Sequence, residues 1–470
     1  MFPTAIATCI LLFCLILNSS SLPSQIENAT FTLTGQHPNP EAVIQEVQRK
    51  VNESVWRRNL FLLTEKDQCQ TGNPIDDCWR CEPNWANNLQ QLADCAIGFG
   101  RDAAGGKGGK IYVVSDSSDD SAVEPKPGTL RHAVIQTEPL WIVFAADMTI
   151  DLRHELVVSS YKTIDGRGSA VRITGVGCII LESVSHVIIH NLQIYNCAPS
   201  KTEELGLSPT QREKKSKSDG DGITVRMSNH IWIDHCALSK CTDGLIDVTE
   251  GSTAVTISNS YFSHHDKVML LGHTDSDAAD DGMQVTVAFN RFGEGLEQRM
   301  PRCRRGYFHV VNNDYTSWGL YAIGGSGNPT INCQGNRFTA PADPNLKEVT
   351  KRLEAEEKEW EDWNWRSNGD VMENGAFFVP SGDGKDDIYA KASSTEPMSG
   401  VLIDQLIQNV GVLCGPGLTG GVKQSGDGSS NWNGYLDGRM NFGGGASSPQ
   451  SGTVTIFLSF FLLLVNSLIF

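Results

Sequence analysis

The sequence predicts an all-β protein built as a parallel β-helix, because short strand-like runs recur about every two dozen residues. These alternating apolar runs are IIHNLQI, IWIDHCAL, VTISNSYF, VTVAFNRF, FHVVNNDY and TINCQGNRF. Their closing residues are Ile194, Leu238, Phe262, Phe292, Tyr315 and Phe338, separated by 44, 24, 30, 23 and 23 positions. One strand cluster per coil is typical of a parallel β-helix, in which each coil contacts only its neighbours. The 46 glycines fit a fold with many tight turns.

The N-terminal part of the chain predicts export. A short apolar run, IATCILLFCLIL, ends in a serine-rich segment and predicts a cleaved signal peptide over residues 1–22, with a buried helix as the alternative. Glycosylation sequons at Asn28 and Asn52 suit an exported chain. Residues 39–58 place apolar side chains along one helical stripe, so we expect residues 23–65 to form a helical segment packed on the domain end. A recognition helix for a partner is the alternative interpretation. The β-helix domain is then expected over residues 66–440.

Cysteine usage agrees with an oxidising compartment. Removal of the signal peptide leaves eleven of the 13 cysteines, and an odd number requires a free thiol, an intermolecular bridge or incomplete pairing. Cys236 and Cys241 are five positions apart, which suggests a local disulfide loop. Cys69 and Cys81 are a further candidate pair. A zinc ribbon is disfavoured because no second CxxC pair is present.

Two polar stretches interrupt the repeat. Residues 197–220 (CAPSKTEELGLSPTQREKKSKSDG) account for the longest interval and predict a charged, loop-like insertion. Lys267 and Arg299 are 32 positions apart, and the run at residues 275–282 (DSDAADDG) predicts an eight-residue bulge between them.

The stretch from residue 219 to 252 contains four aspartates next to glycines: Asp219, Asp221, Asp243 and Asp247. Asp219 and Asp243 are 24 positions apart, as are Asp243 and Lys267. Equivalent residues on adjacent coils lie about 4.8 Å apart, so these side chains and Arg299 are expected to form a column on one outer face. Asp221 lies beside Asp219, because residues i and i+2 of a strand share a face.

Four stacked carboxylates predict a site for a hard cation such as Ca²⁺, which prefers several oxygen ligands. The net charge of −17 would oppose a polyanionic partner, but four arginines gather close to Lys267 in the run RMPRCRRG. A solvated face or a nucleic-acid patch is the usual explanation of such a run. Neither explains cations beside four acids, and we expect no nucleic-acid partner. The combination fits a calcium ion that bridges protein and substrate carboxylates.

Other conspicuous residues are better explained by structure than by chemistry. Trp232, Asp234 and His235 are expected to be buried and hydrogen-bonded. His264, His265 and Asp266 could suggest a catalytic pair, but no serine or cysteine motif accompanies them. Residues 345–364 predict a charged helix or loop over the last coils, with Trp360 and Trp363 as anchors.

The C-terminal end predicts a lipid anchor. Small residues at 443–448 (GGGASS) precede a polar spacer and the apolar tail TVTIFLSFFLLLVNSLIF. Residues 441–470 therefore match a glycosylphosphatidylinositol (GPI) attachment signal, with a tail-anchored helix as the alternative. We expect a monomer held at the outer leaflet of the plasma membrane.

The chain resembles the plant pectate lyases from about residue 66 to 440. The similarity is carried by NPIDDCWRC, LADCAIGFG, TIDGRG, IWIDHC, DGLIDVTEGST, HHDKVMLLGH, RMPRCRRGYFHVVNNDY, YAIGGS and NPTINCQGNRF, in this order. The chain departs from the usual plant pattern at Arg305, Glu250 and residues 317–320. The resemblance implies a right-handed parallel β-helix and disulfides Cys78–Cys95 and Cys178–Cys197.

The resemblance also implies an activity, the Ca²⁺-dependent β-eliminative cleavage of de-esterified homogalacturonan. It places calcium at Asp219, Asp221, Asp243 and Asp247. It assigns substrate carboxylates to Lys267 and Arg304, and the catalytic base to Arg299. Two other function classes stay open: a hydrolase on the same fold, which would yield saturated products, and a non-catalytic pectin-binding protein at the cell surface.

Overall fold

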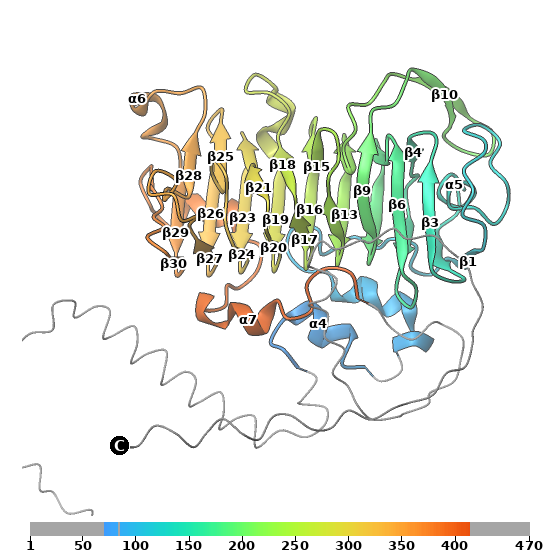
Figure 1. Cartoon of the computed structure of the whole chain (residues 1–470), viewed down its shortest axis with the longest axis horizontal. Coiled ribbons are helices and arrows are strands. Elements are labelled where there is room, and N and C mark those ends of the chain that lie inside the picture. Colours follow the sequence, from blue (N-terminus) through green and yellow to red (C-terminus); the bar gives the residue numbers. More distant parts are fainter. Residues whose placement is uncertain (1–69, 83–84, 414–470) are drawn as a thin grey trace, which may run out of the picture. The chain divides into compact units, whose positions relative to one another are not determined.

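The computed structural model describes residues 70–82 and 85–413, which form a parallel β-helix of three long sheets (Figure 1). The first sheet contains β1 (Lys110–Val114), β2 (Leu140–Phe144), β5 (Lys162–Asp165), β8 (Ser185–His190), β13 (Asn229–Asp234), β16 (Thr253–Ser258), β19 (Gln284–Ala288), β23 (Tyr307–Val311), β26 (Thr330–Gln334) and β29 (Trp365–Asn368). The second, called the site sheet below, contains β4 (Leu156–Val157), β7 (Ile179–Glu182), β12 (Ile223–Arg226), β15 (Gly244–Thr249), β18 (His265–Leu271), β22 (Arg302–Arg304), β25 (Ile323–Ser326) and β28 (Thr350–Arg352), with β21 (Leu296–Gln298) paired to β18. The third contains β3 (Met148–Leu152), β6 (Val171–Val176), β9 (Gln193–Ala198), β14 (Ala237–Ser239), β17 (Tyr261–Ser263), β20 (Arg291–Phe292), β24 (Asp314–Tyr315), β27 (Arg337–Thr339) and β30 (Val371–Glu373).

The repeat predicted from the sequence is confirmed in the third sheet. Each closing residue is the direct partner of the next along the series Ile194, Leu238, Phe262, Phe292, Tyr315 and Phe338. The rings of Phe292 and Tyr315 stack with centroids 4.5 Å apart, and Tyr315 and Phe338 repeat that distance. All six side chains are buried in the interior of the β-helix, so the repeat fixes the register of the coils.

Short helices at both ends of the described chain pack on the outer face of the first sheet (Figure 1). At the N-terminal end these are α4 (Pro74–Trp79), η1 (Trp85–Asn87) and η2 (Leu89–Cys95). Ile75 and Leu92 are buried there in one apolar cluster with Trp141 and Trp232. At the other end, α7 (Ile403–Leu406) packs in the same way, after η4 (Ile388–Ala392) and η5 (Gly400–Leu402). Short helical segments thus pack on the β-helix as the fold class predicts, whereas the helix expected within residues 23–65 lies outside the described residues.

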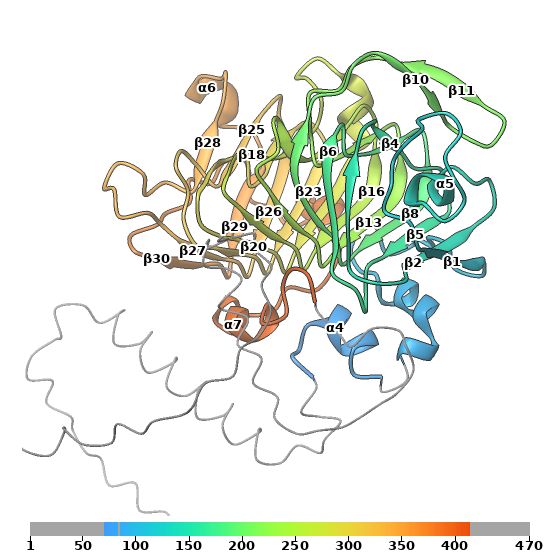
Figure 2. The same cartoon turned by 45° about the vertical axis from the view of Figure 1, so that its right-hand side comes forward.

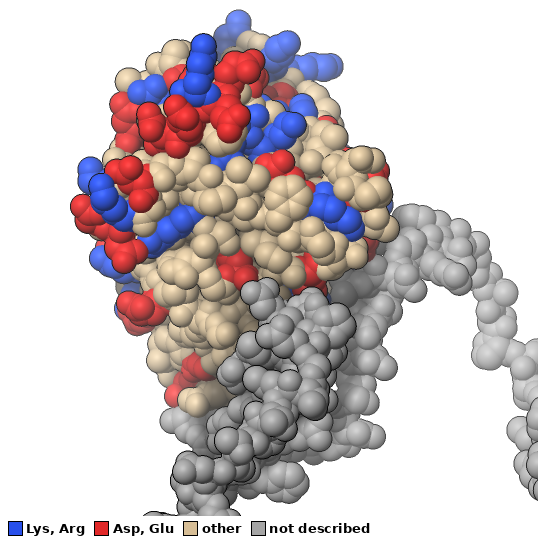
Figure 3. Space-filling model, turned by 90° about the vertical axis from the view of Figure 1, so that its left-hand side faces the viewer, with Lys and Arg blue, Asp and Glu red and all other residues tan. Residues whose placement is uncertain are grey.

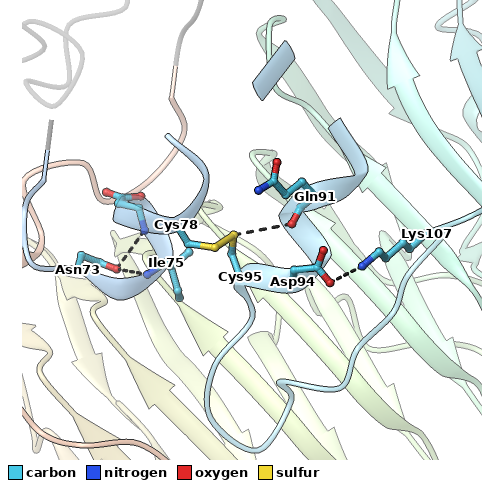
Figure 4. Close-up of a disulfide and its surroundings, with 8 residues drawn as sticks. Asn73, Ile75, Cys78, Gln91, Asp94, Cys95 and Lys107 are labelled. Atoms are coloured by element: carbon cyan, nitrogen blue, oxygen red, sulfur yellow. Dashed lines mark hydrogen bonds and ion pairs between the residues drawn. A yellow bond between two sulfur atoms is a disulfide. The ribbon is translucent and has the colours of Figure 1, made fainter. Parts of the chain in front are cut away.

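The N-terminal helices are joined covalently by the disulfide Cys78–Cys95 (Figure 4). Asn73 caps α4, because its side chain accepts the backbone N–H of Ile75 at 3.1 Å. The second expected disulfide, Cys178–Cys197, is also present.

A disulfide between Cys236 and Cys241 was expected, and this prediction is wrong: both are free thiols, as are Cys303 and Cys333. Cys236 and Cys241 flank the extended strand β14, and five residues of extended chain span about 16 Å. A disulfide needs Cα atoms within about 7 Å. Cys69 is not among the described residues, so its pairing with Cys81 stays a prediction.

Two segments expected as irregular contain regular structure, and a third, expected as a helix or loop, contains both a strand and a helix. The insertion at residues 197–220 forms an antiparallel hairpin of β10 (Glu203–Gly206) and β11 (Arg212–Lys215), which extends beyond the end of the β-helix near β4 (Figure 2). Residues 345–364 contribute β28 to the site sheet before the short helix α6 (Glu357–Trp360). The predicted bulge at residues 275–282 contains η3 (Ala278–Gly282).

The expected signal peptide, the helix at residues 39–58 and the C-terminal anchor signal all lie outside the described residues. Within the described residues, no helix has the length and apolar character needed to cross a bilayer.

One further short helix, α5 (Leu130–Val134), leads into β2.

Candidate active site

Three aspartates converge at the start of two neighbouring strands of the site sheet. Asp219 and Asp221 precede β12, Asp243 precedes β15, and their carboxylate oxygens lie within 4.8 Å of one another. They meet because β12 and β15 pair in parallel, with the carbonyl of Gly244 accepting the N–H of Gly222 at 3.1 Å. The aspartates that the repeat spacing predicted to lie on adjacent coils are therefore close to one another in space.

The buried carboxylate of Asp221 is held in a fixed orientation. The backbone N–H of Gly244 donates to its Oδ1 at 2.7 Å, and the hydroxyl of Thr224 donates to its Oδ2 at 3.0 Å. The sequence analysis missed Thr224, although a threonine three residues after an aspartate has the spacing for such a local hydrogen bond.

Asp247 is the fourth member of this acidic cluster, which we define as Asp219, Asp221, Asp243 and Asp247. A Cβ atom at Gly244 would lie 2.3 Å from Asp247 Oδ1 and 2.9 Å from Asp221 Oδ1. Only glycine leaves room for both carboxylates at this point. The glycines seen in the sequence beside the aspartates thus allow acids from two coils to crowd together.

The pKa values of two aspartates in the acidic cluster are raised. Burial, followed by the charge of Asp219, raises the pKa of Asp221 to about 6. Burial raises the pKa of Asp247 well above its usual range, and Asp221 and Asp243 add to the effect while Arg299 opposes it. Burial is the largest cause of both shifts, and the neighbouring carboxylates add to it.

One lysine contacts the cluster directly. Lys267 Nζ lies 2.5 Å from Asp243 Oδ1, and its predicted role toward a substrate carboxylate stays a prediction. The strict column predicted from the spacing is offset by one residue, since Lys267 pairs with Gly244 and Gln298. The long side chain of Lys267 spans this offset, so its ammonium still contacts the carboxylate of Asp243.

The donor set fits a hard divalent cation. Asp219, Asp221 and Asp243 form a ligand group without histidine or cysteine, and the carboxylate of Asp247 adjoins Asp221 at Gly244. His265 lies nearby, but its Nε2 makes a 2.6 Å hydrogen bond to the backbone carbonyl of Asp243 and so positions the loop. Calcium is therefore compatible with these residues, and zinc is not favoured.

Arg299 lies between β21 and β22, in a left-handed backbone conformation with φ of 63°. Its carbonyl accepts the N–H of Met269 at 2.8 Å, which ties this unusual turn to β18. Its side-chain Nε is buried and makes no hydrogen bond to any described residue. A buried donor without a partner is costly unless a ligand completes it.

Arg304, the arginine predicted to bind a substrate carboxylate, is already engaged. Its Nη1 donates to the carbonyl of His273 at 2.6 Å, and its Nε lies 3.2 Å from Asp275. Burial lowers its pKa, with Arg302 as the next contribution. Arg305 is held in the same way by Asp281. Acids of the bulge at residues 275–282 thus balance two of the arginines and leave Arg299 outside these pairs.

Charge elsewhere on the β-helix is mixed in sign. In Figure 3, which faces the end formed by β28 and β30, lysine and arginine side chains lie among acidic ones. The net charge of −17 therefore does not describe the local surface at this end.

The residues expected to be structural are buried and paired. Trp232 Nε1 donates to Ser258 at 2.9 Å, and the carboxylate of Asp234 contacts His190 and His235. The hydroxyl of the buried Ser258 in turn donates to Asp234 Oδ1 at 2.5 Å, so this serine is part of the same hydrogen-bonded group.

Comparison with known proteins defines the class of enzyme. The family model described as "Pectate lyase" matches residues 91–412, and the chain is a polysaccharide lyase. It belongs to the pectate lyase family. It is 58% identical over 418 residues to "Probable pectate lyase 13" of Arabidopsis thaliana, covering 87% of this chain and 81% of that one. "Pectate lyase" of Zinnia elegans is 54% identical over 407 residues, covering 87% and 98% of the two chains.

A solved relative confirms the fold. The crystal structure of jun a 1, the major allergen from cedar pollen, superposes with a TM-score of 0.71 at 48% identity. The match covers 73% of this chain and 99% of that one. The parallel β-helix expected from the repeat is therefore confirmed by a solved relative.

Proposed function

We propose that this protein cleaves de-esterified homogalacturonan by Ca²⁺-dependent β-elimination, in the modification of plant cell-wall pectin. The observation that carries the proposal is the acidic cluster next to the buried, unbonded Nε of Arg299. Membership of the pectate lyase family supplies the substrate class. The acidic cluster supports the metal requirement, because four carboxylates face one directly contacting cation.

The chain's own residues suit the remaining parts of the reaction. Bound at Asp219, Asp221, Asp243 and Asp247, calcium would withdraw charge from a galacturonate carboxylate and acidify the neighbouring C–H. Lys267 and Arg304 would hold substrate carboxylates. Arg299 takes the proton from the carbon next to the carboxylate, and the 4-oxygen leaves with its bonding electrons as the double bond forms.

Arg299 needs a special environment for this role, since a guanidinium is ordinarily a permanent cation. Nearby positive charge favours the neutral form of a basic group. Arg304, whose pKa is lowered by burial and then by Arg302 with a smaller contribution from Arg299, provides such a neighbour, and Arg299 Nε makes no hydrogen bond to a described residue.

Ultraviolet absorbance of the products tests the proposal directly. Polygalacturonate treated with the protein and calcium is expected to yield 4,5-unsaturated ends, and a chelator is expected to abolish them. Saturated products without a metal requirement would indicate the hydrolase alternative. Binding without any product would indicate a non-catalytic pectin-binding protein at the cell surface.

The proposal includes a location, since the small residues at 443–448 and the apolar tail support a GPI anchor on a secreted, monomeric chain. Phosphatidylinositol-specific phospholipase C is then expected to release the native protein from membranes. Detection of an intact C-terminal tail peptide in the mature protein by mass spectrometry would contradict the anchor.

A further inference from the structure

The hydroxyl of Tyr321 is a buried polar group that makes no hydrogen bond to any described residue. Tyr321 opens the YAIGGS motif, lies just before β25 and is 3% exposed. Burial raises its pKa to about 12, so the group is an uncharged hydroxyl at neutral pH. Most buried hydroxyls are hydrogen-bonded, so this one requires an explanation.

Tyr321 lies on the coil next to that of Arg299. The residues that follow them are joined across the two coils, because the N–H of Met300 donates to the carbonyl of Ala322 at 2.8 Å. Arg299 resembles Tyr321 in its burial, since its Nε is enclosed and makes no hydrogen bond to a described residue. Two buried polar groups without described partners therefore lie on neighbouring coils.

The ring of Tyr321 is held against the backbone of β25, beside the arginines. A Cβ atom at Gly324 would lie 2.2 Å from the ring carbon Cε2, so the ring fills the space that a side chain would need there. Gly324 is the register partner of Arg302 on β22. The charges of Arg302, Arg299 and Arg304 each lower the pKa of the Tyr321 hydroxyl, although burial outweighs them. The hydroxyl therefore lies among the three arginines.

We propose that Tyr321 is a positioning residue for Arg299, and that its hydroxyl oxygen accepts the Nε–H of Arg299 when substrate is bound. The two groups are complementary, because an arginine Nε–H only donates and a hydroxyl oxygen can accept. Hydrogen bonds at catalytic groups are often long in a ligand-free site and shorten in the complex with substrate. This inference rests on the proposed function and names what orients its base.

An uncharged partner suits an arginine that has to act as a base. Arg304 and Arg305 are held instead by the carboxylates of Asp275 and Asp281. The hydrogen bond with Asp281 raises the pKa of Arg305, because a negative partner favours the charged guanidinium. A hydroxyl at the Nε side of Arg299 orients the guanidinium and leaves its Nη nitrogens for the substrate. It does so without adding negative charge.

Tyr321→Phe removes only the hydroxyl and tests the proposal. Turnover of polygalacturonate at saturating calcium should fall about tenfold to a hundredfold, because a poorly oriented base reacts less often. KM and calcium affinity should stay at their wild-type values, since the buried hydroxyl contacts neither substrate nor metal. The melting temperature should not fall, because the hydroxyl has no described partner in the free protein.

Tyr389→Phe is the matched control. Tyr389 also has a buried hydroxyl without a described partner, and burial raises its pKa to about 12 as well. It lies in η4, where the guanidinium of Arg366 is 4.1 Å from its ring centre, and not beside Arg299. Its substitution is expected to leave turnover unchanged.

A double-mutant cycle with Arg299→Lys separates positioning from an independent role. If Tyr321 acts through Arg299, adding Tyr321→Phe to Arg299→Lys should lower turnover no further. The positioning role would be overturned by losses that multiply in the double variant, by unchanged turnover in Tyr321→Phe, or by an equal fall in Tyr389→Phe.

Absence of unsaturated product from the wild-type protein would instead overturn the proposed function. The positioning role is then decided by NMR of protein with isotope-labelled arginine, in the presence of calcium and trigalacturonate. The Nε–H signal of Arg299, identified by its loss in Arg299→Lys, should exchange slowly with water in wild type and in Tyr389→Phe. It should exchange faster in Tyr321→Phe, and equal exchange in all three proteins would refute the proposal.

Discussion

Two clusters of potential metal ligands in this molecule differ in how their charge is balanced. Three acids of the acidic cluster, and separately His190, Asp234 and His235, each lie within 4.8 Å of one another. In the second group Asp234 contacts His190 at 2.9 Å and His235 at 2.6 Å, and His235 also contacts Asp76 at 3.1 Å. We call these four residues the buried cluster. The buried cluster pairs its carboxylates with histidines, whereas the four carboxylates of the acidic cluster have one directly contacting cation, Lys267.

The aspartates of the two clusters show what this difference does. Asp221 and Asp234 are both buried, and burial alone would raise the pKa of each carboxyl. Burial raises the pKa of Asp221 to about 6, and its neighbour Asp219, another acid, adds to this effect. The pKa of Asp234 falls below its usual range because His235 and His190 outweigh burial. Proximity of ligating groups is therefore a weak sign of a metal site, and unbalanced charge is a stronger one.

The largest expected effect comes from the unbonded cation next to the acidic cluster. Arg299→Lys keeps the positive charge but moves the proton-accepting nitrogen, so turnover should fall by about a thousandfold or more. Calcium and oligogalacturonate binding should change little. Steady-state formation of unsaturated product at saturating calcium measures this, alongside calorimetric binding.

Arg304→Lys is the matched contrast, because Arg304 is proposed to bind a carboxylate. Its loss should appear mainly as a raised KM with turnover largely kept. Near-normal turnover in Arg299→Lys would remove Arg299 from the role of base.

The next largest effect concerns the buried cluster. Asp234→Asn leaves the His235 imidazolium with only Asp76 as a charged partner, and breaking a buried pair typically costs about 3–5 kcal/mol. The free energy of unfolding, from urea titration in chelator, should fall by about that amount. The same substitution at Asp221 should not destabilise the metal-free protein, because it removes repulsion. Equal losses in both variants would contradict the contrast between the clusters.

The β-helix could be predicted from the sequence because the same interior position of successive coils carries a buried apolar residue. The row from Ile194 to Phe338 occupies one register position on every coil, and buried apolar side chains are the signal that a sequence carries best. The hairpin β10–β11 was missed because its burial depends on single residues such as Leu205 within a charged run. Its packing surface, Val157 and Ile180, is distant in sequence.

The spacing of the aspartates predicted where the acidic cluster lies. It did not predict which charged groups form ion pairs around the cluster. Asp219, Asp243 and Lys267 recur at the coil length, so the register brought them together. The ion pair of Arg304 with Asp275 depends on how the bulge folds back, and no periodicity encodes it. The resemblance to a known family assigned different roles to Arg299 and Arg304. The hydrogen bonds of the two arginines differ, because Arg304 is already paired and the Nε of Arg299 is not.

A smaller effect is expected from the metal ligands. Asp243→Asn should lower calcium affinity by about tenfold to a hundredfold, since it removes a charged ligand from the acidic cluster. Calcium should raise the melting temperature of the wild-type protein modestly, because it binds the folded state. Calorimetry and thermal unfolding with and without calcium measure both effects. Asp266→Asn is the control, as Asp266 is exposed on β18 outside the cluster, and an undiminished calcium response in Asp243→Asn would exclude this site.

The smallest effect is a pH dependence of the buried cluster. Interaction with Asp234, then with Asp76, overcomes burial and raises the pKa of His235 to about 9, above its ordinary value of 6.5. A raised histidine pKa contributes stability that is fully present below pH 6.5 and is lost as the pH rises through about 9.

The free energy of unfolding should therefore decrease across this window, by at most about 1.4 kcal/mol per pH unit from this group. Urea titrations in chelator at several pH values between 6 and 10 measure the slope. Buried thiols such as Cys236, whose pKa is raised to about 12, favour unfolding at alkaline pH as well. His235→Gln isolates the histidine, because it retains the thiols but should flatten the slope between pH 6.5 and 9. An identical slope in both proteins would show that His235 is not the imidazolium that balances Asp234 and Asp76.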